Sequence, residues 1–202
     1  MTYRPTKTAF RELVALANGQ AGYFTAKQAA AVGYGYPHLD YHVRAGNFER
    51  VGHGLYRLPI IPPGEHDDLV RLALWSRDRN DRPQAVASHE TALAVHELSD
   101  ILPSKSHVTV PNSFRKPAPR GTVLHRRAQN CADVENRDGF LVTSPLRTIL
   151  DVADDDRISE EHLEKALAEA LQRGLVSRSR LKGIVKTLPA ASRLSRSLAA
   201  LR

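Results

Sequence analysis

Residues 23–59 read YFTAKQAAAVGYGYPHLDYHVRAGNFERVGHGLYRLP, and this stretch decides how the N-terminal part of the chain folds. Thr25 stands where a helix N-cap belongs, and Gln28 three residues later completes a capping box that opens an alanine-rich helix. This helix should end at Gly33, because glycine readily adopts the left-handed conformation that ends helices. Pro37 then suits the first turn of a second helix, where its missing N–H costs nothing.

The second helix is expected to have one apolar and one polar face. Leu39 and Val43 lie four residues apart and share the face that should pack on the preceding helices. The opposite face carries polar, planar or cationic groups able to reach base edges and phosphates, although its tyrosines could also be half-buried packing residues. The candidate DNA-contacting residues of this helix are Tyr36, His38, Tyr41, His42 and Arg44.

A short hairpin should follow. Gly46 ends the second helix, and β-prone segments at residues 47–52 and 54–58 flank a glycine-rich turn. Two helices, their turn and a hairpin in this order predict a winged helix-turn-helix, which presents one helix to the DNA major groove and the hairpin to the neighbouring backbone. The candidate DNA-contacting residues of the hairpin are Arg50, His53 and Arg57.

The chain of 202 residues is long enough for a second folded part. Residues 59–64, PIIPPG, are stiff and cannot continue a sheet, so we expect a winged-helix domain at 1–60 and a second domain at 61–202. Mixed helical and β-prone patterns make the second domain, and the whole chain, α+β. The patterns predict helices at 66–79, 89–98, 145–153 and 160–173, with Ser88, Ser144 and Ser159 as N-caps, and strands at 107–110, 122–125 and 140–142.

Positive charge is segregated along the chain, whose net charge is +7. Residues 1–60 carry seven Lys and Arg against three Asp and Glu, and residues 103–137 carry seven against two. Residues 175–202, predicted as a basic helical tail, carry seven and no acid. A phosphate backbone would suit such segments, although a solvated surface or simple packing of the tail explains them equally well. The candidates for a second basic surface are Arg126, Arg127, Arg178, Arg180, Lys182 and Lys186.

Composition indicates an intracellular protein. A single cysteine, Cys131, permits no intramolecular disulfide, which fits a reducing cytoplasm. The sequence shows no signal-like N-terminal apolar run and no apolar run near 18 residues, so neither export nor a membrane span is expected.

Four motifs in series carry a family resemblance. They are GLYRLP at 54–59, SHETALAVHEL at 88–98, VTVP at 108–111 and VTSPLRTILD at 142–151. Together they resemble the AbiEi family of antitoxins, and the resemblance covers nearly the whole chain. It implies a cytoplasmic bacterial protein whose winged helix represses its own operon and whose C-terminal domain is needed for antitoxin activity.

The resemblance also implies partners. The DNA partner would be the protein's own promoter, where two copies would bind inverted repeats because one copy seldom reads enough bases. The functional partner would be a nucleotidyltransferase-like toxin, opposed without a stable complex as in type IV systems. Neutralisation by direct binding, or by enzymatic modification of the toxin, is the alternative.

Motifs for catalysis or metal binding are missing from the sequence. There is no phosphate-binding G-x-x-x-x-G-K loop, no G-x-S-x-G elbow and no H-E-x-x-H helix, so we expect no catalytic residue and no cofactor. His89 and His96 lie seven residues apart, too far for the usual helical metal pair. Asp154-Asp155-Asp156 should be a solvated loop, and no metal site is expected. Arg147 and Asp151 should form an intrahelical ion pair, unless Arg147 grips a phosphate or a partner carboxylate.

Overall fold

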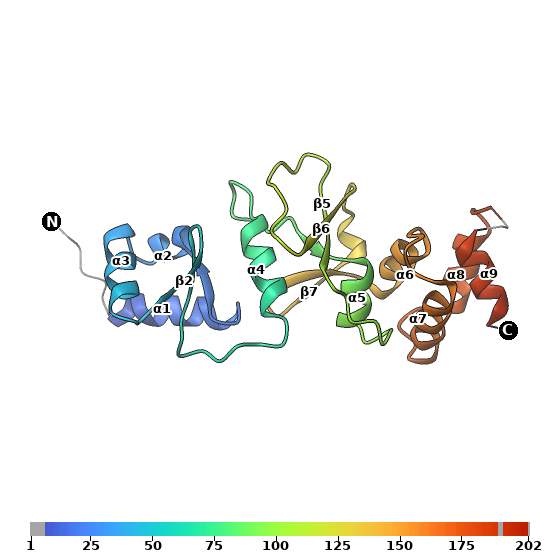
Figure 1. Ribbon diagram of the computed structural model, residues 1–202, viewed down its shortest axis with the longest axis horizontal. Helices are drawn as coiled ribbons and strands as arrows, with labels where there is room; N and C mark the ends of the chain where they lie inside the picture. Colours follow the sequence, from blue (N-terminus) through green and yellow to red (C-terminus); the bar gives the residue numbers. More distant parts are fainter. Residues whose placement is uncertain (1–6, 190–191, 202) are drawn as a thin grey trace. The chain divides into compact units, whose positions relative to one another are not determined.

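The computed structural model describes residues 7–189 and 192–201, and the chain forms two compact units (Figure 1). The first unit comprises Met1–Gln84 and Asn136–Phe140, and the second comprises Ala85–Glu135 and Leu141–Arg202. Helices and strands occur in both units, so the predicted α+β class is confirmed.

The first unit contains a winged helix-turn-helix, as predicted. Its elements are α1 (Lys7–Asn18), β1 (Tyr23–Thr25), α2 (Ala26–Ala31), α3 (Tyr36–Arg44), β2 (Glu49–Gly52) and β3 (Leu55–Arg57). The strands form an antiparallel sheet in the order β1-β3-β2, in which Arg57 lies between Tyr23 on one side and Glu49 on the other. Strand β1, which the sequence pattern did not predict, therefore ties the wing to the start of α2.

Aromatic side chains form the centre of this winged helix. Phe24 and Phe48 are fully buried, and their ring centroids lie 5.3 Å apart in an edge-to-face arrangement. Tyr56 stacks on Phe24 at a centroid distance of 5.7 Å. Leu39 is also buried, and Val43 packs against the same cluster, as the helical spacing predicted. One face of α3 is thus fixed in the core, which leaves the other face available.

Helix α4 (Asp67–Ser76) belongs to the first unit, which therefore extends past the predicted domain boundary. The hydroxyl of Tyr23 donates to the Asp67 carboxylate at 3.1 Å, and Arg77 donates to the side-chain oxygen of Gln20 at 2.8 Å. These two bonds attach both ends of α4 to the segment that carries β1.

A later stretch of the chain, Asn136–Phe140, completes the first unit. Gly139 has φ +89, and a Cβ atom there would lie 3.1 Å from the carbonyl oxygen of Gly19. The ring of Phe140 meets that of His66 edge-on, with centroids 5.5 Å apart. The positive φ of residue 139 and its close approach to the Gly19 carbonyl require glycine at this position.

The second unit is built on a five-stranded mixed sheet in the order β6-β5-β4-β8-β7. The strands of this sheet are β4 (Val86–Ala87), β5 (Ser106–Val110), β6 (Thr122–Arg126), β7 (Val134–Arg137) and β8 (Phe140–Thr143). The last two residues of β7 and the first residue of β8 belong to the segment Asn136–Phe140 of the first unit. Strand β4 pairs with β5 in antiparallel and with β8 in parallel orientation, and β5 pairs with β6 in parallel. The three predicted strands are present, whereas β4 and β7 were not predicted.

Helices cover the rest of the second unit. They are α5 (His89–Val95), α6 (Pro145–Ala153), α7 (Glu160–Gln172), α8 (Arg178–Val185) and α9 (Arg193–Ala200), with a 3-10 turn, η1 (Cys131–Asp133), before β7. The hydroxyls of Ser144 and Ser159 accept the cap bonds predicted for them. Ser88 occupies the predicted N-cap position of α5, but its hydroxyl makes no cap bond because it is bonded to Thr109 and His89. None of the described helices is long and apolar enough to cross a bilayer.

Candidate DNA-binding surface

The turn between α2 and α3 is built from local bonds. Thr25 accepts from the backbone N–H of Gln28 at 3.1 Å, and the Gln28 side chain accepts from the Thr25 N–H at 2.8 Å, which is the predicted capping box. Gly33 then takes φ +99, and Tyr34 donates its N–H to the carbonyl of Ala29 at 2.8 Å. The chain is thereby turned so that α3 can begin at Tyr36.

Helix α3 presents two tyrosines to solvent. Tyr36 is 75% exposed and Tyr41 is 66% exposed, whereas Leu39 between them is buried. The two phenols are therefore not packing residues of this unit. Planar side chains with a hydroxyl at the tip are able to contact bases and phosphates.

Arg44 also lies on the exposed side of α3. Its guanidinium contacts the Asp40 carboxylate at 2.8 Å, with the arginine side chain 79% and the aspartate side chain 61% exposed. Solvent-exposed pairs of this kind contribute little to stability, so a phosphate can compete for Arg44 at low cost.

The two histidines of α3 are more enclosed. The Asn47 side-chain amide donates to His42 Nδ1 at 3.1 Å, and the His42 ring stacks on Phe48 at 4.7 Å. Burial, and then the neighbouring His38, lower the pKa of His42, so this ring stays neutral. His38 is half-buried. Both placements favour a supporting role for these predicted contact residues.

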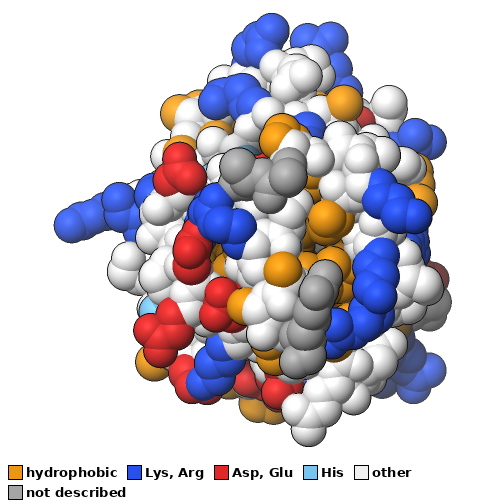
Figure 2. Space-filling view, turned by 90° about the vertical axis from the view of Figure 1, so that its right-hand side faces the viewer, with side chains coloured by type: hydrophobic (Ala, Val, Ile, Leu, Met, Phe, Trp, Pro, Cys, Tyr) orange, Lys and Arg blue, Asp and Glu red, His pale blue; other side chains and the backbone are white. Residues whose placement is uncertain are grey.

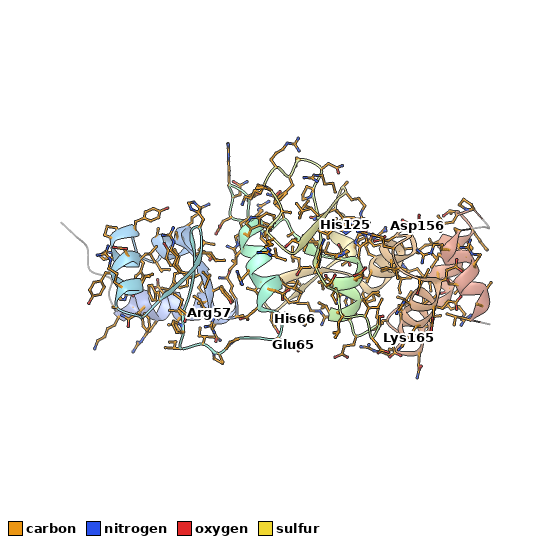
Figure 3. All side chains as sticks on the ribbon, viewed as in Figure 1. Arg57, Glu65, His66, His125, Asp156 and Lys165 are labelled. Carbon is orange, nitrogen blue, oxygen red and sulfur yellow. The ribbon has the colours of Figure 1, made fainter. Side chains whose placement is uncertain are left out.

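The three predicted contact residues of the wing also differ in exposure, as those of α3 do. Arg50 and His53 are exposed, and Gly54 with φ +65 forms the turn beside them. Arg57 is held instead, since its guanidinium donates to the Ile61 carbonyl at 2.6 Å and its side chain is only 12% exposed (Figure 3). We therefore assign Arg57 mainly to the joint between β3 and the following segment.

The second basic surface remains a prediction, and its members differ in exposure. Arg178, Arg180, Lys182 and Lys186 are all exposed, while Leu181 beneath them is fully buried. Figure 2, drawn from the side on which α8 and α9 lie in Figure 1, shows Lys and Arg side chains along its right-hand edge and Asp and Glu at its lower left.

Arg127 of the same candidate group is engaged in the structure. It forms an ion pair with Asp151, which is 2% exposed and also pairs with Arg147 at 2.7 Å. The predicted Arg147–Asp151 pair is therefore present, and it is part of a three-residue network around the buried Asp151 carboxylate. Arg126 is exposed.

His89 at the start of α5 and His96 just after its end make contacts with different partners. His96 contacts the carbonyl of Thr143 through Nε2 at 2.7 Å, whereas His89 stacks on His125 with ring centroids 3.5 Å apart. The third ring near them is His107, on β5. Among the residues that the structure describes, no three His, Cys, Asp or Glu side chains are placed so that they could hold a metal ion together. No sequence pattern predicts the cluster of His89, His107 and His125, because the pairing of β5 with β6 and the packing of α5 bring these distant residues together.

Comparisons with known proteins match both parts of the chain. A family model described as a transcriptional regulator, AbiEi antitoxin, matches residues 11–59, and a model of the AbiEi antitoxin C-terminal domain matches residues 85–199. The crystal structure of the RV2827C protein from Mycobacterium tuberculosis superposes with a TM-score of 0.59 at 19% identity, covering 98% of this chain and 78% of that one. This structural likeness concerns the fold. No curated protein sequence matches the chain.

Proposed function

The chain belongs to the AbiEi family of antitoxins and transcriptional regulators, and we propose that it represses its own operon. It would do so by binding promoter DNA through α3 and the wing. The operator would contain inverted repeats bound by two copies, since a single winged helix reads few base pairs. The proposed place of action is the cytoplasm, and the partner in the operon is a nucleotidyltransferase-like toxin.

One observation carries the DNA-binding proposal. The face of α3 opposite Leu39 presents Tyr36, Tyr41 and Arg44 to solvent, and the wing adds Arg50 and His53 at its exposed strand and turn. The cations on α3 and on the wing are suited to bind phosphates on both sides of a groove. The tyrosines of α3 are suited to contact base edges or sugars. Within this set, Arg44 and Arg50 supply the phosphate contacts.

The test measures binding of a fluorescent duplex from the protein's own promoter across a range of salt concentrations. Replacing both Arg44→Ala and Arg50→Ala should weaken binding at least about tenfold and reduce the slope of log affinity against log salt by about 1.8. Lys165→Ala, which removes an exposed lysine of the second unit, is the matched control and should change neither. An unchanged slope in the double variant would show that this surface does not bind DNA.

The antitoxin role is assigned to the second unit, without catalysis by this protein. We infer that the toxin is opposed without a stable complex. Co-purification of the full chain with the toxin at moderate salt would contradict that inference and favour direct binding. A mass change on the toxin after mixing would instead indicate enzymatic modification.

A further inference from the structure

The second unit contains a polar cavity that DNA binding by α3 and the wing does not use. It has a volume of about 360 Å³ and lies where the ends of β5 and β6 meet the start of α5 and the loop after α6. A cavity of this size accommodates a small polar molecule. Every residue that lines it is polar or charged: His89, Thr109, His125, Arg126, Arg127, Asp151, Asp154, Asp155 and Arg157.

Arginine neutralises two of the three carboxylates in the lining. Asp151 is held by Arg127 and, from behind, by Arg147 at 2.7 Å. Asp155 accepts from Arg157 at 2.8 Å and 2.6 Å, and the hydrogen bonds from Arg157 keep the pKa of Asp155 low, at about 2. These bonds fix the orientation of two guanidinium groups at the cavity.

Arg126 adds a cation that no carboxylate balances. Its side chain is exposed at the end of β6, and no ion pair involves it within the described ranges of the chain. Three guanidinium groups therefore line the cavity together with three carboxylates, and two of these carboxylates are already paired with arginine. Arg126 is the lining cation that is left to attract an anionic ligand.

The hydrogen-bond network sets the proton positions on His89. Thr109 donates its hydroxyl hydrogen to Ser88 Oγ at 2.9 Å. His89 Nδ1 lies 3.0 Å from the Ser88 hydroxyl, and we assign Ser88 as the donor in this contact. In this tautomer His89 carries its proton on Nε2 and offers one N–H donor.

We assign the complementary arrangement to His125. Glu90 lies 3.9 Å from His107 Nε2, and its carboxylate favours a proton on that nitrogen, which makes Nδ1 the acceptor. His125 Nε2 lies 3.2 Å from His107 Nδ1 and is the donor in this arrangement, so that His125 Nδ1 is an acceptor. Burial, and then the neighbouring imidazole charge, lower the pKa of both His89 and His125 to about 4, so both stacked rings are neutral.

The backbone at His89 has an unusual, left-handed conformation. His89 has φ +52, and among the described residues lining the cavity only His89 has a positive φ. A left-handed conformation in a residue other than glycine is retained where surrounding bonds enforce it, often at binding sites.

We propose that this cavity binds the phosphate group of a small hydroxyl-bearing molecule, of the class of pentose phosphates and ribonucleotides. Arg126 and the unused N–H groups of Arg127 bind the phosphate oxygens, together with the Nε2–H of His89. His125 Nδ1 and Asp154 accept hydrogen bonds from hydroxyls. Because the lining combines donors with acceptors, bare phosphate should bind more weakly than a phosphorylated sugar.

Calorimetric titration of the full chain tests this proposal with inorganic phosphate, ribose, ribose 5-phosphate and adenosine 5′-monophosphate. Ribose 5-phosphate should bind at least about tenfold more tightly than inorganic phosphate, and ribose should not bind. Tighter binding of the nucleotide than of ribose 5-phosphate would identify a nucleotide site, and equal binding a sugar-phosphate site. Absence of binding by both esters at millimolar concentration would overturn the proposal.

Variants separate the two ends of the ligand. Arg126→Gln, at an exposed position, should weaken ribose 5-phosphate binding about tenfold without changing the melting temperature. His89→Asn keeps an acceptor for Ser88 and tolerates the left-handed backbone, but removes the Nε2–H, so it should weaken both phosphate and ribose 5-phosphate. Unchanged affinity in both variants would place any phosphate binding elsewhere.

A matched pair of substitutions tests the acceptor. His125→Gln retains a donor near the Nε2 position toward His107, but lacks the acceptor at Nδ1. It should weaken ribose 5-phosphate and leave inorganic phosphate unchanged. His125→Asn retains an oxygen near the Nδ1 position and should bind ribose 5-phosphate more tightly than His125→Gln. The reverse order would contradict the assigned proton positions.

Discussion

Each unit contains an aspartate and an arginine four residues apart on one helix, yet the two pairs lie in opposite environments. In α3, Arg44 and Asp40 approach to 2.8 Å with 79% and 61% of their side chains exposed. In α6, Arg147 and Asp151 approach to 2.7 Å with 17% and 2% exposed. The same groups at the same spacing form an exchangeable surface pair in one unit and a fixed part of a buried network in the other.

This contrast extends to the surroundings of each pair. Around Arg44 lie exposed side chains with room to adjust, which suits the repeated charges of a DNA backbone. Asp151 itself is bonded to Arg127 and Arg147, which fixes these side chains in place and suits one small ligand of defined shape. Burial therefore distinguishes the two sites more clearly than residue type does.

Breaking the buried pair should have the largest effect. Asp151→Ala leaves Arg127 and Arg147 without their shared carboxylate, and we expect the free energy of unfolding to fall by about 3 kcal/mol. Urea unfolding followed by circular dichroism measures this loss. A loss below about 1 kcal/mol would mean that the Asp151 network is as dispensable as a surface pair.

Acid should destabilise the folded protein through the histidines of the cavity. The folded chain holds the pKa of His89 and His125 near 4, below the ordinary value of 6.5, so unfolding takes up protons between these values. Stability should therefore fall as pH falls from 6.5 toward 4, by up to about 1.4 kcal/mol per pH unit for each histidine. Urea unfolding at a series of pH values measures the slope. His125→Gln should reduce it, and an equal slope in the variant would exclude His125 as a source.

Removing the exposed tyrosines should separate binding from stability in the first unit. Tyr36→Ala with Tyr41→Ala is expected to weaken operator binding about tenfold, while the free energy of unfolding changes by less than about 0.5 kcal/mol. Ile60→Ala removes a side chain of similar exposure, 68%, in the segment after the wing and serves as the control. If the tyrosine double variant binds the operator as tightly as the Ile60→Ala control does, the two tyrosines do not contact DNA.

Breaking the exposed pair should have the smallest effect. Asp40→Ala is expected to change the free energy of unfolding by less than about 0.5 kcal/mol. Operator binding at low salt should be unchanged or somewhat tighter, because a negative charge next to Arg44 is lost. A destabilisation comparable to that of Asp151→Ala would end the contrast between the two pairs.

Local features of the fold were predictable from the sequence. The capping box of Thr25 and Gln28 and the helices opened by Ser144 and Ser159 depend on residues within one helical turn, and the structure contains them. Strands β1, β4 and β7 were missed because strands of two to four residues have too little periodicity, and their pairing partners are distant in sequence.

The sites were less predictable, for a related reason. Exposure of Tyr36 and Tyr41 follows from helical periodicity once Leu39 is placed in the core. The tight bonding of His42 and Arg57 depends on Asn47, Phe48 and Ile61, which lie four to six residues away in irregular turns that helix and strand periodicity does not describe. The cavity depends on strand register, since β5 and β6 set Thr109 opposite His125.

The return of Asn136–Phe140 to the first unit has a consequence for synthesis of the protein. A ribosome releases the winged helix and α4 long before it releases Gly139 and Phe140. The first unit therefore cannot form the contacts of these residues with Gly19 and His66 until that later segment has been synthesised. By then β4 and β5 have also emerged. The two units should therefore finish folding close together in time, although the DNA-reading segment is translated first.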